Sequence, residues 1–364
     1  MILNNIIPIT YVNNNLSPDF FIFNNLIAEG TKPMYSAIVF SPLAFGKDEE
    51  TEFIINKFKA NEYYVKELTG KEASVFNIDH YIKEFPYEVF HICSHGGEVD
   101  GYTRIEDFID RDGNSHTVEY DEVVSFAPHK SEENIQVSSV FIFRKFDGLI
   151  WKSKELSEKE YEKFVFVDML DHIKNIKRKK GKKNNNILDS SHIKCSDFNY
   201  QPMFNIIAGS HTNPLIFNNT CFSWSDISDS FLNSGARGYI GTLWSIKNVI
   251  AKEVAETFYT NIFDGTILDA LQKGLIHTNS DSDFNVYIYW GLHFSSIQSG
   301  VSLSESRINI TKKILYSIDR WIDHKDKEKN VETRSLIDIL IRWNVNQLYD
   351  FFQKETYLLY FKKL

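Results

Sequence analysis

Cysteine is scarce in this chain of 364 residues, which holds only three, at Cys93, Cys195 and Cys221. An odd count without close pair spacing argues against a disulfide framework and favours a reducing compartment. No apolar run approaches the roughly 18 residues that a membrane span needs. The first residues also lack the basic region and cleavage pattern of a secretory signal. The composition therefore predicts a cytoplasmic chain that makes no contact with a membrane.

An excess of positive charge is also absent, since the formal net charge is −9. A surface that binds nucleic acid would need clustered Lys and Arg, so no direct nucleic-acid partner is expected. The local exception is the run Lys177–Lys183, which offers no apolar side chain for burial. A solvated loop that is exposed and open to cleavage is favoured there over a nucleic-acid contact. No Gly-rich phosphate loop is found, and no cofactor is predicted.

Apolar and aromatic residues are plentiful, at 43% and 15% of the chain, and supply a packed core. Between residues 35 and 97 the pattern predicts three strands, at Tyr35–Phe40, Tyr63–Leu68 and Tyr87–Gly97. Amphipathic helices are predicted between them, at Asp48–Ala60 and Val75–Lys83. Strands that alternate with helices indicate an α/β fold with a mostly parallel sheet flanked by helices.

The second half of the chain repeats this alternation. Buried strands are predicted at Leu215–Phe217, Arg237–Leu243 and Asn285–Gly291, with helices at Asn248–Phe263 and Ile267–Leu275. Alternation of this kind extends the sheet of the first half. The regularity is lost from residue 126 to about residue 205.

The sequence therefore predicts one domain over residues 1–300 and a C-terminal helical extension over residues 301–364. The domain core comprises residues 35–125 and 205–295, and an irregular insertion occupies residues 126–204. Within the core, residues 99–125 are expected to form a hairpin. In the insertion, the short apolar run Phe164–Val167 is expected to be a strand.

Two side chains with the chemistry of a thiol hydrolase follow predicted strands. Cys221 lies where the strand Leu215–Phe217 breaks into polar residues, and His95 ends its own strand. In an α/β protein, a side chain at the carboxyl end of a strand faces the crevice in which ligands bind. A cysteine thiolate is a nucleophile, and an adjacent imidazole can take its proton.

The order of these motifs resembles that of the CHAT domain, a caspase-like cysteine peptidase of clan CD. The family has a strand that ends in His-Gly and a strand that ends in Cys, then a helix, Gly-Ala-Arg and a strand closing in Leu-Trp. Here these are Phe90–Gly96, Asn218–Ser223 and Phe231–Trp244, with a closing Tyr289–Gly291. No 34-residue tetratricopeptide period, which often accompanies the family, is present.

The resemblance implies that His95 is the general base and Cys221 the nucleophile, acting through an acyl-enzyme. The backbone amides of Gly96 and Cys221 would form the oxyanion hole. It further implies an endopeptidase that cleaves a specific protein partner and is activated by a trigger or a regulatory protein, as in bacterial defence or signalling. A catalytically silent CHAT-fold scaffold that binds partners is the alternative.

The segment Trp244, Ser245 and Ile246 is expected to line the substrate cleft and to pair with an extended peptide. Alternatively, Trp244 is a core aromatic residue. An acidic side chain in the first pocket would favour Arg or Lys before the cleaved bond. Asp226 and Asp229 are candidates for it, although Asp226 could instead cap the helix that follows.

A metal site is not predicted. His91, Cys93 and His95 alternate along one strand, but successive residues on one face lie about 7 Å apart, which is too far for one tetrahedral zinc. Cys195 is expected to be an exposed bystander beside the basic run.

Overall fold

The structure is a computed structural model, and it describes residues 33–43, 49–128, 135–175, 181–201, 212–224, 226–277 and 286–361. The chain divides into two compact units. Unit 1 comprises Met1–Gly97, Phe126–Gln136 and Ser191–Leu364, and unit 2 comprises Glu98–Ser125 and Val137–Ser190. Most of the predicted basic loop Lys177–Lys183 lies outside the described residues, whereas Lys182 and Lys183 are exposed at the start of a strand.

Unit 1 contains a six-stranded sheet in the order β12-β11-β10-β3-β1-β2. Every neighbouring pair is parallel except β11 and β12, which are antiparallel. A mixed α/β fold with a mostly parallel sheet is thus confirmed. The strands are β1 (Ser36–Ser41), β2 (Tyr64–Thr69), β3 (Val89–Cys93), β10 (Leu215–Asn219), β11 (Gly238–Thr242) and β12 (Tyr287–Gly291).

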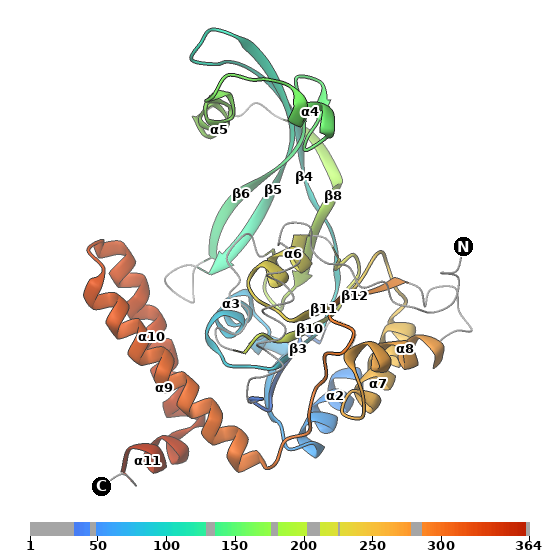
Figure 1. The fold of residues 1–364 in the computed structure, drawn as a ribbon, viewed down its shortest axis with the longest axis vertical. Helices are drawn as coiled ribbons and strands as arrows, with labels where there is room; N and C mark the ends of the chain where they lie inside the picture. The colour runs from blue at the N-terminus through green and yellow to red at the C-terminus, as the bar shows by residue number, and fades with distance from the viewer. Residues whose placement is uncertain are drawn as a thin grey trace. The chain divides into compact units, whose positions relative to one another are not determined.

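Helices cover both faces of this sheet, because its strands are apolar on both sides. One face carries α3 (Val75–Glu84) and α6 (Asp226–Asn233), which pack on residues such as Phe40, Phe90 and Ile216. The opposite face carries the helices whose side chains pack on Val39, Phe217 and Ile240 (Figure 1). These are α2 (Glu49–Ala60), α7 (Asn248–Asn261) and α8 (Ile267–His277).

The C-terminal segment is helical, as predicted, and forms α9 (Leu303–Lys327), α10 (Val331–Phe351) and α11 (Gln353–Phe361). They belong to unit 1, and α9 and α10 pack against α3 and the core beside it, while α11 packs on α9 and α10. Trp343 of α10 lies edge-on to Tyr81 of α3, with 5.0 Å between the ring centroids. The Tyr81 hydroxyl donates a 2.8 Å hydrogen bond to Gln347. One side of the extension is therefore part of the unit 1 core.

Unit 2 is built on long antiparallel strands. Strands β4 (Gly96–Ile109) and β5 (Ser115–Pro128) pair from Gly101 to Ile109, as predicted for a hairpin. They belong to a second sheet in the order β4-β8-β9-β5-β6-β7. The other strands of this sheet are β6 (Ile135–Phe146), β7 (Leu149–Ile150), β8 (Lys182–Lys194) and β9 (Asn199–Tyr200), of which β9 and the end of β8 belong to unit 1. The helices of unit 2, α4 (Lys154–Glu158) and α5 (Val165–Asn175), follow β7 in the sequence.

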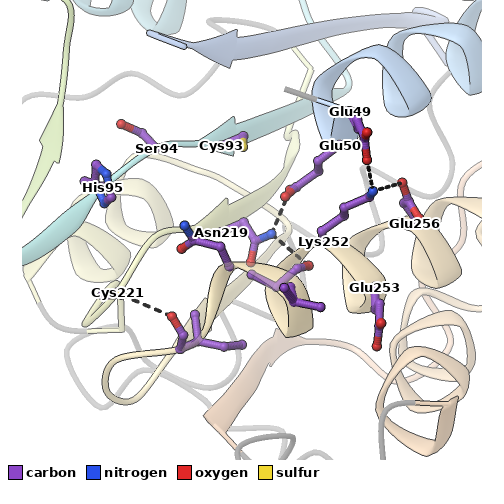
Figure 2. Close-up of a pocket in the computed structure, with 14 residues that line it drawn as sticks. Glu49, Glu50, Cys93, Ser94, His95, Asn219, Cys221, Lys252, Glu253 and Glu256 are labelled. Atoms are coloured by element: carbon purple, nitrogen blue, oxygen red, sulfur yellow. Dashed lines mark hydrogen bonds and ion pairs between the residues drawn. The ribbon is translucent and has the colours of Figure 1, made fainter. Parts of the chain in front are cut away.

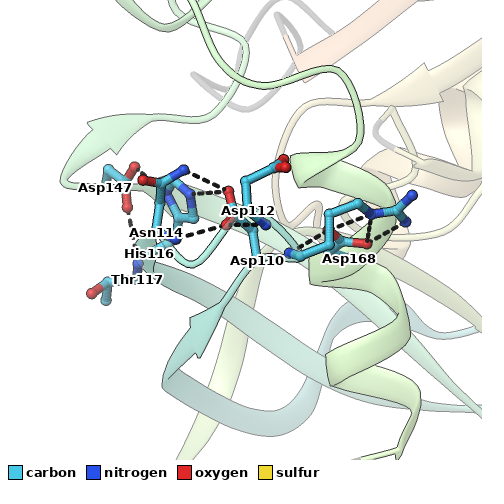
Figure 3. A network of polar contacts seen from close by, with 8 residues as sticks. Asp110, Asp112, Asn114, His116, Thr117, Asp147 and Asp168 are labelled. Carbon is cyan, nitrogen blue, oxygen red and sulfur yellow. Dashed lines mark hydrogen bonds and ion pairs between the residues drawn. The ribbon is translucent and has the colours of Figure 1, made fainter.

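A polar network holds the turn of the β4–β5 hairpin (Figure 3). His116 lies between two carboxylates, with its Nδ1 2.9 Å from Asp147 and its Nε2 3.2 Å from Asp110. Asp110 also accepts hydrogen bonds from the backbone amides of Asp112 and Asn114. Burial alone would lower the pKa of His116, but the hydrogen bonds to Asp147 and Asp110 raise it above its usual value.

Two expectations are wrong. Phe164–Val167 is not a strand, because α5 begins at Val165 and buries Val165, Met169 and Ile173 on one helical face. Cys195 is not exposed, since only 4% of it is accessible, and burial raises the pKa of its thiol.

Candidate active site

The two candidate catalytic residues lie at matching positions after neighbouring strands. Strands β3 and β10 pair in parallel, and the last pair in their register is Cys93 with Asn219. His95 and Cys221 each follow that pair by two residues. Neighbouring strands lie about 4.8 Å apart, so this register brings the two residues to adjacent places at the carboxyl edge of the sheet.

Both strands are held rigidly by burial. Each of the five residues of β3 and of β10 is buried, and the two strands lie in the middle of the sheet. The apolar side chains Phe90 and Ile216 pack on one face, while Val89 and Phe217 pack on the other. A site at the ends of such strands is positioned by the core rather than by loops.

Gly96 brings the segment after His95 against the segment that carries Cys221. A Cβ atom on Gly96 would lie 2.5 Å from Thr220 Oγ1 and 2.7 Å from the carbonyl oxygen of Cys221. Contacts this short do not occur for real side chains, so the backbones can approach only because residue 96 is glycine. On the other side of His95, its carbonyl oxygen accepts a 2.9 Å hydrogen bond from the amide of Lys194.

A tight turn presents Cys221. Phe222 adopts φ of 53°, a left-handed conformation that is costly for a bulky residue and is often found at functional sites. The buried Ser223 holds the turn, since its hydroxyl donates to Asn218 O at 3.0 Å and accepts from Thr242 N at 2.8 Å. The turn is thus tied to both β10 and β11.

His95 and Cys221 line one pocket of about 440 Å³. His95 is exposed and Cys221 is half-buried, so a substrate could reach both. Figure 2 shows them toward one side of the pocket, with Glu49, Lys252, Glu253 and Glu256 toward the other. The pocket is lined by Glu49, Glu50, Cys93, Ser94, His95, Asn219, Cys221, Ile246, Asn248, Val249, Ala251, Lys252, Glu253 and Glu256.

A buried polar network extends inward from two lining residues of the pocket, Glu50 and Asn219. Glu50 Oε1 is 3.0 Å from His91 Nε2 and accepts a 2.7 Å hydrogen bond from Asn219 Nδ2. The hydroxyl of Tyr287 donates to Asn219 Oδ1, and that of Tyr259 lies 3.3 Å from His91 Nδ1. Burial raises the pKa of both tyrosines well above the usual value, and Glu50 adds to the effect. Both therefore stay neutral and act as fixed hydrogen-bonding groups.

Of the predicted substrate segment, Ile246 lines the pocket, and its carbonyl oxygen is 3.9 Å from Cys221 Sγ. Trp244 and Ser245 are described but are not in the lining. Trp244 is 48% exposed, so it is not a core aromatic residue, and its carbonyl oxygen accepts from Phe222 N at 3.5 Å.

Of the two predicted acidic pocket residues, only Asp229 has a described side chain. Asp226 is the first residue of α6, and its side chain lies outside the described part of the structure. Asp229 also lies on α6 and is not in the lining. Sequence reasoning instead missed the glutamates of α2 and α7, because it assigned these two segments only as helices of the α/β core.

No protein-family model matches the chain, and no curated protein matches it. Within the described ranges, no group of three or more His, Cys, Asp or Glu residues could hold a metal ion. No helix there is long and apolar enough to cross a membrane.

Proposed function

We propose that the protein is a cysteine endopeptidase of the caspase-like CHAT type, with His95 as general base and Cys221 as nucleophile. One observation carries the proposal: the two residues occupy matching positions after neighbouring parallel strands and line one pocket. A fold alone does not define an activity, but a thiol and an imidazole in one accessible cleft form a chemically competent pair.

The reaction follows from these groups. The imidazole of His95 takes the proton of the Cys221 thiol, and the thiolate attacks the carbonyl carbon of the scissile peptide bond. The backbone amides of Gly96 and Cys221 stabilise the oxyanion, and the imidazolium returns its proton to the departing amine. Water then hydrolyses the acyl-enzyme, with His95 again accepting a proton, and the free thiol is restored.

The substrate is a protein segment in extended conformation. The residues Trp244–Ile246 follow the strand β11 and lead to the pocket, with Ile246 beside the Cys221 sulfur. A peptide that runs along this segment would form main-chain hydrogen bonds, as in other cases of strand addition. A regulatory protein could control access to it, and a CHAT-fold scaffold without catalysis is the competing function.

Covalent labelling tests the proposal. The full chain is treated with a peptide acyloxymethyl ketone, and the modified residue is identified by mass spectrometry. Labelling of Cys221 that is lost in Cys221→Ala and slowed in His95→Ala is expected. Cys93→Ala is the matched control, because Cys93 lines the same pocket but is only 2% exposed. Equal labelling of wild type and His95→Ala, or no labelling at Cys221, would favour the scaffold.

A further inference from the structure

The wall of the pocket opposite the thiol is strongly acidic. Four carboxylates line it, from Glu49 and Glu50 of α2 and from Glu253 and Glu256 of α7, against the single ammonium of Lys252. Lys252 does not neutralise them all, because it pairs with Glu49 and lies 3.9 Å from Glu256. A cleft lined by one sign of charge attracts ligands of the opposite sign.

Glu50 is the buried member of this group. Its side chain is only 8% exposed, and Figure 2 shows it extending from α2 toward Asn219. Both of its polar contacts, with His91 and Asn219, use the same oxygen, Oε1. Among the described residues, no hydrogen bond or ion pair involves its other oxygen, Oε2. A carboxylate buried to this extent has acceptor capacity left for a ligand.

Among the described residues, no lysine or arginine forms an ion pair with Glu50, although the charge of Lys252 acts on it from a distance. A buried carboxylate is stable only when it is paired and hydrogen-bonded, and within the described residues its ion-pair partner is His91. Neighbouring carboxylates add to the cost. Burial is the largest cause that raises the pKa of Glu256; Lys252 opposes the shift, and Glu50 and Glu49 add to it. A cation bound in the pocket would relieve this repulsion.

The position of Glu50 relative to the thiol fits one side chain of a substrate. Glu50 is hydrogen-bonded to Asn219, the last residue of β10, and Cys221 follows two residues later in the turn after the strand. Two residues of chain span at most about 7 Å, a distance that an arginine or lysine side chain can cover. The residue whose carbonyl Cys221 attacks would therefore place a long side chain near Glu50.

We propose that this pocket is the subsite for an arginine or lysine side chain on the acyl side of the cleaved bond, with Glu50 as the carboxylate that receives its charge. The inference rests on the proposed function for the identity of the ligand as a peptide. Oε2 of Glu50 accepts hydrogen bonds from the guanidinium or ammonium group, and Glu253 and Glu256 contribute to the field at the entrance.

The first measurement is independent of the thiol chemistry. Binding of benzamidine, a cation, and of benzamide, its neutral counterpart, is measured by thermal shift on the full-length Cys221→Ala protein. Benzamidine is expected to stabilise this protein and benzamide is not.

Adding Glu50→Gln should abolish the effect of benzamidine, while Glu52→Gln, an exposed position on the same helix, should preserve it. Because Glu50→Gln also alters the contacts of His91 and Asn219, Glu253→Gln is a second variant, for which weaker stabilisation is expected.

The second measurement uses the active thiol. Acyloxymethyl ketones with arginine, citrulline or glutamate next to the ketone are compared for their rate of labelling Cys221. The arginine probe should react at least about tenfold faster than the citrulline probe, as expected for charge-assisted hydrogen bonds. Equal rates for the three probes, with labelling at Cys221, would overturn the subsite and leave the peptidase intact. Benzamidine binding without labelling by any probe would overturn the peptidase and retain the subsite.

Discussion

Gly96 and Cys221 lie so close that a side chain at position 96 is impossible without movement of the backbone. The position of a Cβ on Gly96 is 2.7 Å from the carbonyl oxygen of Cys221. The residue that follows the proposed base is thus in direct contact with the proposed nucleophile. The two halves of the site, which come from distant parts of the sequence, are coupled at this point.

Gly96→Ala should therefore disrupt the site. The new methyl group would collide with Thr220 and with the backbone of Cys221, and would push the two segments apart. A displacement of about 1 Å can cost about 100-fold in rate, so a loss of this size is expected in the labelling rate of Cys221. Gly265→Ala is the control, because its φ lies outside the left-handed region and the atoms nearest a Cβ there belong to the movable side chain of Asp269. Labelling of Gly96→Ala at the wild-type rate would contradict the prediction.

Ser223→Ala should destabilise the fold and loosen the turn that carries Cys221. The mutation leaves the buried Asn218 carbonyl and Thr242 amide without the Ser223 hydroxyl. The loss of partners for buried groups costs about 1–3 kcal/mol of unfolding free energy. Urea unfolding measures the difference, with Ser304→Ala on the exposed first turn of α9 as control. A change no larger than that of the control would show that the hydroxyl is dispensable.

The elements that position the site could be predicted from the sequence, because short apolar runs such as Leu215–Phe217 and Tyr35–Phe40 are typical of buried strands. His95 and Cys221 were identifiable because each follows such a run. Their register was not, since it depends on which strands become neighbours. Only the structure shows that β10 lies beside β3.

The acidic wall could not be predicted for a similar reason. Glu49 and Glu50 are on α2, and Glu253 and Glu256 are on α7. In the sequence, each pair looks like an ordinary helix surface. They converge because α2 and α7 cover the same face of the sheet, where Ile54 and Val254 share one core. This convergence depends on which helices become neighbours in the fold, and the periodicity of a single helix does not show that.

Arg237→Ala should be strongly destabilising. Arg237 and Glu88 form a buried pair at 3.3 Å, and each is 6% exposed. Burial raises the pKa of Glu88, and Arg237 opposes that shift. Removal of the guanidinium therefore leaves a buried carboxyl group without the positive charge that offsets its desolvation. The expected cost is about 3–5 kcal/mol in unfolding free energy.

A double-mutant cycle measured by urea unfolding checks this assignment. Adding Glu88→Gln to Arg237→Ala should recover part of the lost stability, because the buried charge is removed with its partner. Arg237→Lys, which keeps the charge, should lose less, and Arg342→Ala at an exposed position should be near neutral. Strictly additive effects of the two substitutions would argue against a coupled pair.

His116 should make the stability of unit 2 depend on pH. Its pKa is raised in the folded state by Asp147 and Asp110, against the effect of burial, so its charged form is favoured on folding. The resulting stabilisation is fully present below the unfolded pKa of about 6.5 and is lost as the pH rises through the higher folded pKa. Burial alone would raise the pKa of Asp147, but the hydrogen bond with His116 lowers it. The stabilisation that comes from the Asp147 carboxylate is therefore lost only at acidic pH, as the pH falls through that lowered value.

The unfolding free energy of wild type should therefore exceed that of His116→Asn by more at pH 6 than at pH 9, whereas His293→Asn at an exposed site should show no such trend. A difference that does not change with pH would mean that His116 holds the hairpin turn in its neutral form.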